Sequence, residues 1–218
     1  MQQQQSRKQR VRSYAIRGTR MATASHRALE QLLPRYQASK DDWNTQQGRR
    51  LEVEIGCGAG ESVLHYAQTR PDSLQIAFEV YPPVVASLLK RLQLAELPNV
   101  RVQMQDALVR LPELALPASL ASIRVLYPDP WPKRRHHKRR LLDADFLLMA
   151  RRLLAANGEL LFATDWRKYY EQVVKLAQAG DWKIAATGDA ARDDRPPTRF
   201  ELRASKEGRA SFNLLLRT

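Results

Sequence analysis

The chain has 218 residues, 44% of them hydrophobic, which is enough to build the core of one large domain or two small ones. Lysine and arginine number 36 against 23 acidic residues, and the formal charge of +13 favours a polyanionic partner, either nucleic acid or an anionic membrane. No apolar run approaches the roughly 18 residues of a membrane-spanning helix, so the sequence predicts no transmembrane segment.

The cysteine and histidine content argues against disulfides and metals. Cys57 is the single cysteine, which excludes a disulfide within the chain and a cysteine-based zinc site. The adjacent His136 and His137 lack the spacing that would direct both rings at one metal. The first residues also lack the apolar segment of a signal peptide. We therefore expect a cytoplasmic protein without a metal site.

Residues 1–20 are rich in glutamine and arginine, a composition that cannot bury enough apolar surface to fold alone. From Arg10 to Arg20 apolar residues are interleaved with the basic ones, which suits an arm that becomes ordered on RNA. A helix is predicted over 25–33, ending before Pro34, because proline is unfavourable inside a helix. Residues 21–49 are thus expected to be a helix and linker that pack on the following domain.

From residue 50 to residue 218, strand and helix patterns alternate, which predicts one further domain. Strands are predicted at 51–55, 74–80, 100–104, 123–127, 159–164, 182–187 and 211–217. Helices are predicted at 61–69, 83–95, 143–156 and 169–179, the third one stopped by Asn157-Gly158. The pattern predicts an α/β fold, with a doubly wound, mostly parallel, seven-stranded Rossmann-like sheet.

Three glycines, Gly56, Gly58 and Gly60, follow the first strand and come just after Glu54. A dinucleotide-binding loop would need its third glycine where Glu61 stands, and a P-loop would need a Gly-Lys-Ser/Thr sequence. An acid before the glycines would repel a pyrophosphate but suits a cationic or zwitterionic ligand such as S-adenosylmethionine. A tight turn without a ligand is the alternative.

Two further acids end the next two strands. Glu79 ends the second predicted strand, where a nucleoside-binding sheet places a carboxylate on the ribose hydroxyls. Asp106 ends the third and could accept a hydrogen bond from an adenine amino group. One acid at a strand end is often only a helix cap. Acids at the ends of three successive strands, with Glu54 the first, predict one adenosyl pocket.

The fourth predicted strand runs into a proline-flanked acid and a basic segment. Asp129 lies between two prolines, Trp131 follows, and residues 133–140 are eight consecutive basic side chains. The prolines end the strand because proline cannot donate to the sheet ladder. Asp129 is therefore expected at the edge where open α/β sheets place catalytic groups. A solvated basic loop is the alternative, and stacking on a base or packing under the segment are both open for Trp131.

These motifs, together with residues 163–166 (Ala-Thr-Asp-Trp) and 198–201 (Thr-Arg-Phe-Glu), resemble the bacterial tRNA (guanine-N7-)-methyltransferases from about Arg12 to the carboxyl terminus. The resemblance implies a class I S-adenosylmethionine-dependent fold and methylation of N7 of guanine 46 in the variable loop of tRNA. It implies a cofactor site formed by Glu54, Gly56, Gly58, Gly60, Glu79, Asp106 and Asp129, with Asp129 also the catalytic acid. It implies substrate binding by Lys133, Asp165, Thr198, Arg199, Phe200 and Glu201. Contacts with the RNA backbone are expected from Arg134, Arg135, Lys138, Arg139 and Arg140.

Guanine N7 carries a lone pair and no proton, so the transfer needs alignment of the reactants but no general base. The methylated base is cationic, and a fixed carboxylate such as Asp129 can stabilise the charge as it develops. Asp165 or Glu201 could accept the N1 and N2 hydrogens of guanine, which adenine does not present. The basic segment would then position the RNA through its phosphates without reading its sequence.

Other functions remain open on the sequence alone. A non-catalytic RNA-binding protein on the same scaffold would bind RNA without binding the cofactor. A methyltransferase that acts on another RNA or on a small molecule is a third possibility, although a small-molecule enzyme leaves the basic segment unexplained. The glycine spacing disfavours a nicotinamide-dependent oxidoreductase. Both a monomer and a homodimer fit the sequence, and stacking and packing are both open for Phe200, which is expected in a loop.

Overall fold

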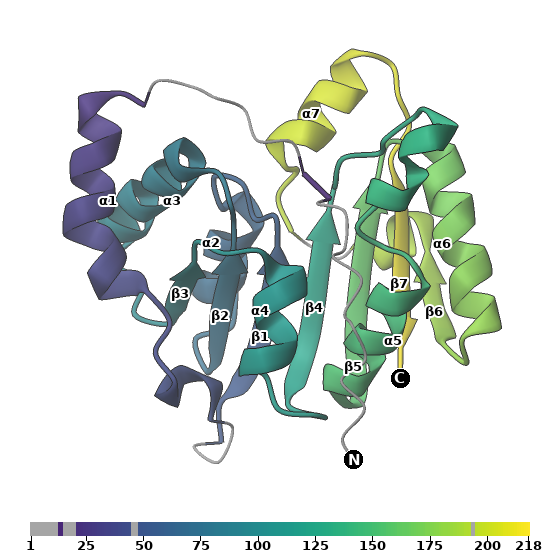
Figure 1. The fold of residues 1–218 in the computed structure, drawn as a ribbon, viewed down its shortest axis with the longest axis horizontal. Helices are drawn as coiled ribbons and strands as arrows, with labels where there is room; N and C mark the ends of the chain where they lie inside the picture. Colours follow the sequence, from purple (N-terminus) through teal and green to yellow (C-terminus); the bar gives the residue numbers. More distant parts are fainter. Residues whose placement is uncertain (1–12, 15–20, 45–47, 193–194) are drawn as a thin grey trace, which may run out of the picture.

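A computed structural model describes residues 13–14, 21–44, 48–192 and 195–218 (Figure 1). Most of the predicted basic arm, residues 1–20, lies outside the described residues. Over the described part of the chain, no helix is both long enough and apolar enough to cross a membrane. The same residues contain no group of three histidine, cysteine or acidic side chains that could hold a metal ion.

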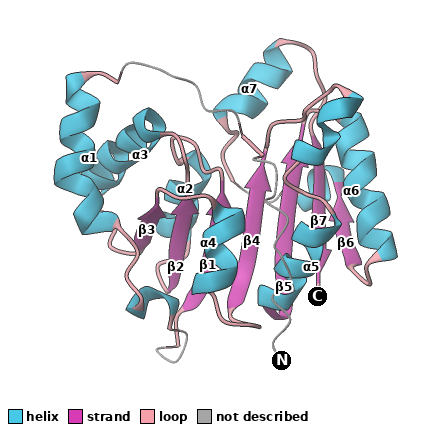
Figure 2. Ribbon diagram, in the orientation of Figure 1, coloured by secondary structure: helices cyan, strands magenta, loops and turns pink. Residues whose placement is uncertain are grey.

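The described residues form one sheet of seven strands in the order β3-β2-β1-β4-β5-β7-β6 (Figure 2). The strands are β1 (Arg50–Ile55), β2 (Ser73–Phe78), β3 (Val100–Gln103), β4 (Leu120–Leu126), β5 (Leu154–Thr164), β6 (Lys183–Thr187) and β7 (Phe212–Arg217). Strands β1 to β5 run parallel to one another, and β7 runs antiparallel to both β5 and β6. The predicted doubly wound, mostly parallel α/β fold is confirmed.

The strand order reverses between β1 and β4, because the chain first adds strands on one side of β1 and then on the other. In open α/β sheets such a reversal leaves a crevice at the carboxyl ends of the two strands, where ligands bind. The topology therefore places the glycine loop after β1 beside the proline-flanked acid after β4.

Helices cover both faces of the sheet. They are α1 (Thr23–Tyr36), α2 (Glu61–Thr69), α3 (Pro82–Ala95), α4 (Ala107–Leu114), α5 (Ala144–Leu153), α6 (Arg167–Ala179) and α7 (Arg199–Lys206). Three 3₁₀ turns are described as well, at Asp41–Trp43, Arg134–Arg139 and Gly188–Ala191. One face buries a large apolar cluster with α4, α5 and α6, and the other buries a second cluster with α1, α2 and α3.

Two predicted helix ends are wrong. The first helix continues through Pro34 to Tyr36, and the backbone N–H of Gln37 still donates to Leu33 O at 2.8 Å. A proline in the last turn removes one hydrogen bond, and burial of Leu32 and Tyr36 in the second cluster holds the turn in place. The helix predicted to stop at Asn157-Gly158 ends instead at Leu153, and that dipeptide lies inside β5.

Two helices were missed. Asp106, interpreted as a strand end, also begins α4, because its carboxylate accepts a hydrogen bond from the N–H of Leu108 at 2.9 Å. The segment from Thr198 to Glu201 is the first turn of α7 and not a loop. It forms a capping box, in which the Thr198 hydroxyl accepts from the N–H of Glu201 and the Glu201 carboxylate accepts from the N–H of Thr198.

Candidate active site

The glycine loop after β1 leaves room for a ligand at two of its three glycines. Gly56, Gly58 and Gly60 all have positive φ, at 74°, 58° and 82°. No atom lies within 4 Å of the place that a Cβ would take at Gly56 or Gly58, whereas at Gly60 it would meet Leu88 Cδ1 at 2.3 Å. The first two glycines therefore border open space, and the third lets the loop pack closely on α3.

Glu79 joins this loop to the start of α3. Its Oε2 accepts from the N–H of Gly58 at 3.2 Å, and its Oε1 accepts from the N–H groups of Val80 and Tyr81 at 2.7 and 3.0 Å. These bonds turn the chain away from the sheet, so β2 ends at Phe78 and not at the predicted residue 80. Glu79 is thus fixed beside the glycine loop at the carboxyl edge of the sheet.

Glu54 lies at the base of the loop and is almost completely buried, with 2% of its surface exposed. Its Oε2 is 3.3 Å from Nε of Arg124, which lies opposite on β4. Burial raises the pKa of Glu54 above its usual value, and Arg124 offsets this rise only in part. Sequence reasoning missed Arg124, although a lone arginine at the centre of an apolar strand was a signal for a buried partner.

A strained loop carries Asp129 at the end of β4. Tyr127 and Trp131, on either side of the Pro-Asp-Pro sequence, have positive φ of 53° and 45°, which is rare for aromatic residues. Neighbouring elements fix both ends, because Tyr127 OH donates to Ser211 Oγ at 2.8 Å and Arg140 Nε donates to Pro130 O at 2.9 Å. Asp129 itself is exposed on this loop. Such strain persists only where the surroundings impose it, and it is typical of functional sites.

The basic segment after this loop is largely exposed. It forms the 3₁₀ turn Arg134–Arg139, and its most exposed side chains are those of Lys133, Arg134, Arg135 and Lys138. Arg139 is half-buried and lies 3.9 Å from the ring centre of Trp131. Trp131 also donates from Nε1 to Ser13 O at 2.9 Å, so its ring is packed under the segment.

Arg140 does not fit the predicted contact with RNA phosphates. Only 2% of its surface is exposed. Besides Pro130 O, it donates to the side-chain carbonyl of Gln172 on α6, and its guanidinium lies 4.8 Å from the ring centre of Tyr169. Arg140 therefore attaches the Asp129 loop to α6, and its place at the end of a basic run concealed this structural role.

The two predicted guanine acceptors, Asp165 and Glu201, differ in how many other side chains of the protein already engage them. Asp165 is exposed enough to reach a ligand, with 21% of its side chain accessible, and its Oδ2 accepts from Arg209 Nε at 2.7 Å. Glu201 accepts from Arg192 Nε at 2.9 Å and Arg195 Nη1 at 2.8 Å, besides its bond in the capping box. Burial raises the pKa of Glu201, but these arginines outweigh it and hold the pKa below its usual value. Phe200 points outward, with 55% of its surface exposed.

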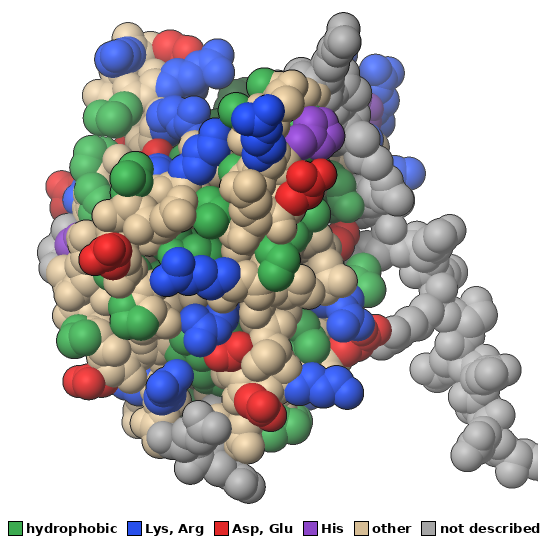
Figure 3. Space-filling model, turned by 90° about the vertical axis from the view of Figure 1, so that its left-hand side faces the viewer, with side chains coloured by type: hydrophobic (Ala, Val, Ile, Leu, Met, Phe, Trp, Pro, Cys, Tyr) green, Lys and Arg blue, Asp and Glu red, His purple; other side chains and the backbone are tan. Residues whose placement is uncertain are grey.

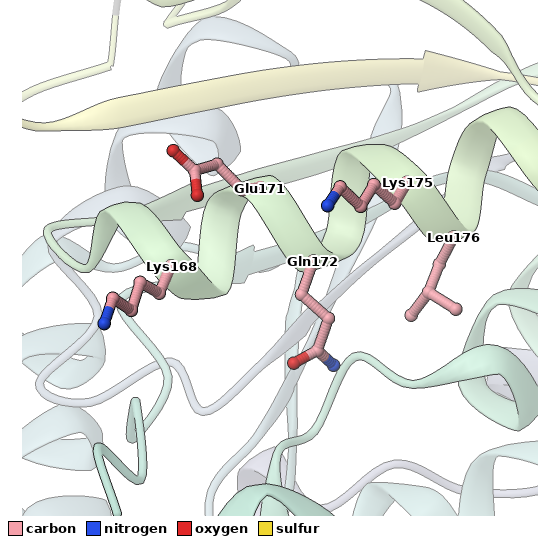
Figure 4. Close-up of a pocket in the computed structure, with 5 residues that line it drawn as sticks. All are labelled: Lys168, Glu171, Gln172, Lys175 and Leu176. Carbon is pink, nitrogen blue, oxygen red and sulfur yellow. The ribbon is translucent and has the colours of Figure 1, made fainter. Parts of the chain in front are cut away.

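A hollow of about 380 Å³ runs along α6 (Figure 4). It is lined by Lys168, Glu171, Gln172, Lys175 and Leu176. None of the acids at the strand ends lines it, so this hollow is not the expected cofactor site. Gln172 links it to the basic segment through its bond with Arg140.

The sheet order, the open glycine loop and the acids at the ends of β1, β2 and β3 define a class I S-adenosylmethionine-dependent methyltransferase. The family described as "Putative methyltransferase" matches residues 49–214. The chain belongs to the tRNA (guanine-N7)-methyltransferase family. A tRNA (guanine-N(7)-)-methyltransferase of Thiobacillus denitrificans is 40% identical over 95% of each chain. One of Streptomyces coelicolor is 37% identical over 95% of this chain and 81% of the other.

Solved structures agree with this fold. An antibiotic-related methyltransferase superposes with a TM-score of 0.62 at 17% identity, over 83% of this chain and 95% of the other. The 16S rRNA methyltransferase KamB superposes with a TM-score of 0.57 at 16% identity, over 95% of this chain and 98% of the other. At such identities the likeness shows the fold alone.

Proposed function

We propose that the protein transfers a methyl group from S-adenosylmethionine to N7 of guanine 46, in the variable loop of tRNA. Relatives that match nearly the whole chain are named tRNA (guanine-N(7)-)-methyltransferases. The observation that carries the proposal is the placement of Asp129. A strained loop presents this acid after β4, which is the sheet neighbour of the strand that carries the glycine loop, and the exposed basic segment follows it directly in the chain.

The residues at the strand ends fit the cofactor. The open space at Gly56 and Gly58 admits close approach of a ligand to the backbone. Glu54 offers a carboxylate to a cationic group, and Glu79 and Asp106 offer oxygens to ribose hydroxyls and an amino group. When bound, S-adenosylmethionine supplies a methyl group activated by a sulfonium. The protein's part is to hold the guanine in line with that methyl group and to exclude water.

Asp129 would stabilise the positive charge that the purine gains during transfer, and its rigid loop makes little reorganisation necessary. Asp165 is a better acceptor for the guanine N1 and N2 hydrogens than Glu201, because the Glu201 carboxylate is already engaged by two arginines and a backbone N–H. Thr198 and Glu201 would contribute by beginning α7, which presents Arg199 and Phe200 at its first turn.

The tRNA backbone would lie on the exposed basic segment, with Lys133 nearest to Asp129 in the chain. Basic side chains also gather on the side formed by α1 and α3, toward the end to which the parallel strands point (Figure 3). Folded RNA is recognised largely through its shape and phosphates. A surface of this kind suits a folded tRNA and leaves base selection to the pocket.

The test is a methyl-transfer assay on unmodified tRNA, with the product mapped by chemical cleavage at N7-methylguanosine. We expect cleavage at position 46 alone. Asp129→Asn should lower the transfer rate at least a hundredfold and still bind the cofactor in calorimetry, whereas the exposed Asp145→Asn on α5 serves as a matched control with full activity. Cleavage elsewhere would refute the position. RNA binding without cofactor binding would instead support the non-catalytic alternative.

A further inference from the structure

Charged side chains are buried at the centre of the sheet. Parallel strands covered on both faces are normally apolar throughout, yet Glu52 and Glu54 of β1 are 0% and 2% exposed. Arg124 of β4 is 2% exposed and stands directly opposite Glu54 in the strand register. Ions so deep in a protein persist only when partners compensate their lost hydration.

The guanidinium of Arg124 is held from several sides. Its Nη1 donates to Glu52 Oε2 at 2.7 Å, its Nε to Glu54 Oε2 at 3.3 Å, and its Nη2 to the side-chain carbonyl of Gln75 on β2. The ring of Tyr66 on α2 covers the group, with its centre 4.0 Å from Cζ. Every nitrogen of Arg124 therefore has a partner, and its orientation is fixed.

The two glutamates depend on Arg124 to different degrees. Glu52 has a second cation, because Arg70 Nη1 lies 2.9 Å from the same Oε2. Burial raises the pKa of Glu52, but Arg124 and Arg70 outweigh it, and the pKa lies below its usual value. Glu54 has Arg124 alone within ion-pair distance among the described residues, and its pKa stays raised. Loss of Arg124 should therefore affect the charge of Glu54 most.

We propose that Arg124 is a positioning residue for cofactor binding, which holds the Glu54 carboxylate in its charged form and in one orientation at the base of the glycine loop. This inference rests on the proposed function, in which Glu54 faces a cationic cofactor. Arg124 lies beneath the loop and acts through Glu54. In this way the buried Arg124 in the sheet orients Glu54 as a cofactor-binding group at the edge of the sheet.

Several polar and titratable groups surround Glu54. Burial raises the pKa of Glu54, whereas Arg124 from β4, Ser62 from α2 and Arg195 from the segment before α7 lower it. Glu52 from β1 and Tyr66 from α2 contact Arg124, and Glu54 in turn helps to raise the pKa of the Cys57 thiol in the glycine loop. Arg195 is engaged by Glu201 at 2.8 Å and acts on Glu54 at longer range. Cys57 is a buried thiol whose pKa is raised well above its usual value by burial, so it stays neutral.

The experiment measures the dissociation constant of S-adenosylmethionine by calorimetry between pH 6 and pH 9. It compares the wild type with Arg124→Met and Arg124→Lys. Titration of the ligand's own amino group affects all three proteins equally, so it cancels in the ratio of variant to wild type. An arginine beside a carboxylate lowers that carboxylate's pKa by about 1 to 3 units, so Arg124→Met should raise the pKa of Glu54 by about that much.

At the acid end of this range we expect Arg124→Met to bind the cofactor about tenfold to a hundredfold more weakly, because a larger fraction of Glu54 is protonated once Arg124 is lost. The ratio of the variant's dissociation constant to that of the wild type should fall toward one as the pH rises and Glu54 regains its charge. Arg124→Lys keeps the positive charge and should stay within a fewfold of the wild type. A loss that is constant across the pH range, or no loss at all, would refute the positioning role.

Two further variants separate folding from binding. If Arg124→Met does not fold, the pair Glu52→Gln with Arg124→Met removes one charge of each sign and should show the same pH-dependent ratio. In a Glu54→Gln background, Arg124→Met should cause no further loss of affinity, whereas an additional tenfold loss there would contradict the inference. A wild type that binds no cofactor would sink the proposed function itself, while equal binding by all variants would sink only the role of Arg124.

Discussion

The two faces of the sheet are built on different physical terms, and β4 shows the contrast within two neighbouring residues. Ile123 is fully buried in the apolar cluster under α4, α5 and α6. Arg124, the next residue, lies on the other face and binds two glutamates and a glutamine. On that face the apolar residues fall into two separate clusters, one with α1, α2 and α3 and one around Leu126 and Leu161.

The difference shows how stability and chemistry are divided between the faces. Burial of apolar surface on the α4–α6 face stabilises the fold at about 25 cal/mol per Å². Buried ions contribute little net stability, because desolvation opposes their attraction. Buried ions instead hold side chains in fixed orientations. Here Arg124 fixes Glu52 and Glu54, and Glu54 lies at the base of the glycine loop. We therefore expect substitutions in the apolar face, under α4, α5 and α6, to change mainly the free energy of unfolding. Substitutions in the polar face, which carries Glu52, Glu54 and Arg124, should change mainly the affinity for the ligand.

The largest effect on stability is expected from a cavity in the apolar face. Phe162 on β5 is completely buried, and its ring packs edge-on to Tyr169 at 5.3 Å. Phe162→Ala should lower the free energy of unfolding by about 3 to 5 kcal/mol in urea titrations, with cofactor affinity unchanged in the folded protein. Leu148→Ala, at a site 73% exposed on α5, is the control and should stay within about 0.5 kcal/mol. A large loss of cofactor affinity in Phe162→Ala would contradict the division between the faces.

A smaller and pH-dependent effect is expected on the polar face. Glu52→Gln keeps the shape and removes the charge that Arg124 and Arg70 engage, so it should cost about 1 to 3 kcal/mol at pH 7. Because the pKa of Glu52 is lowered in the folded state, its stabilising effect is complete above the usual value of about 4.3 and is lost as the pH falls through the lowered value.

The gap in unfolding free energy between the wild type and Glu52→Gln should therefore narrow as the pH falls below about 4. Urea titrations from pH 7 down to pH 3 measure this gap. The control is Glu159→Gln on β5, whose carboxylate forms a partly exposed ion pair with Arg217 on β7 and which should show a small gap throughout. A gap for Glu52→Gln that stays constant into acid would show that altered packing, and not the charge, matters.

The alternation of apolar segments was sufficient to predict the sheet and most helices, because the period of each pattern reports how it is buried. The two short helices that begin with a capping side chain, α4 and α7, were not predicted. Asp106 and Thr198 each begin a helix of eight residues, and such short helices have too few turns to show a clear periodicity. The Thr-x-x-Glu capping signature of α7 was nevertheless visible in the sequence.

The site was predictable as an edge of the sheet, but the partners of its residues were not. Acids at strand ends follow from order along the chain, and the placement of Glu54, Glu79 and Asp106 agrees with that order. Arg140 could not be assigned in this way, because a cationic side chain within a basic run is normally at the surface. The place of Arg124 within an apolar strand indicated burial, but not which residues would be its partners. The burial of both arginines depends on strand register and on α6, which are tertiary properties.

The smallest effect on stability, and a clear one on tRNA binding, is expected in the basic segment. The triple substitution Arg134→Ala, Arg135→Ala and Lys138→Ala should change the unfolding free energy by no more than about 0.5 kcal/mol per site, since all three side chains are exposed. Removing one cation that binds a phosphate should reduce the slope of log affinity against log salt concentration by about 0.7 to 0.9. Filter binding of tRNA between about 50 and 300 mM salt measures that slope, with the exposed Lys183→Ala on β6 as the control.

Arg140→Ala should show the opposite behaviour, although Arg140 belongs to the same run of basic residues. Its buried guanidinium holds Pro130 O and Gln172, so its loss should destabilise the protein by about 1 to 3 kcal/mol and leave the salt slope unchanged. It should also lower the rate of methyl transfer, because the loop that carries Asp129 loses its attachment to α6. A reduced salt slope without loss of stability would show that Arg140 binds an RNA phosphate and would contradict its structural role. The two outcomes differ in kind, because burial decides whether an arginine stabilises a loop or binds a phosphate.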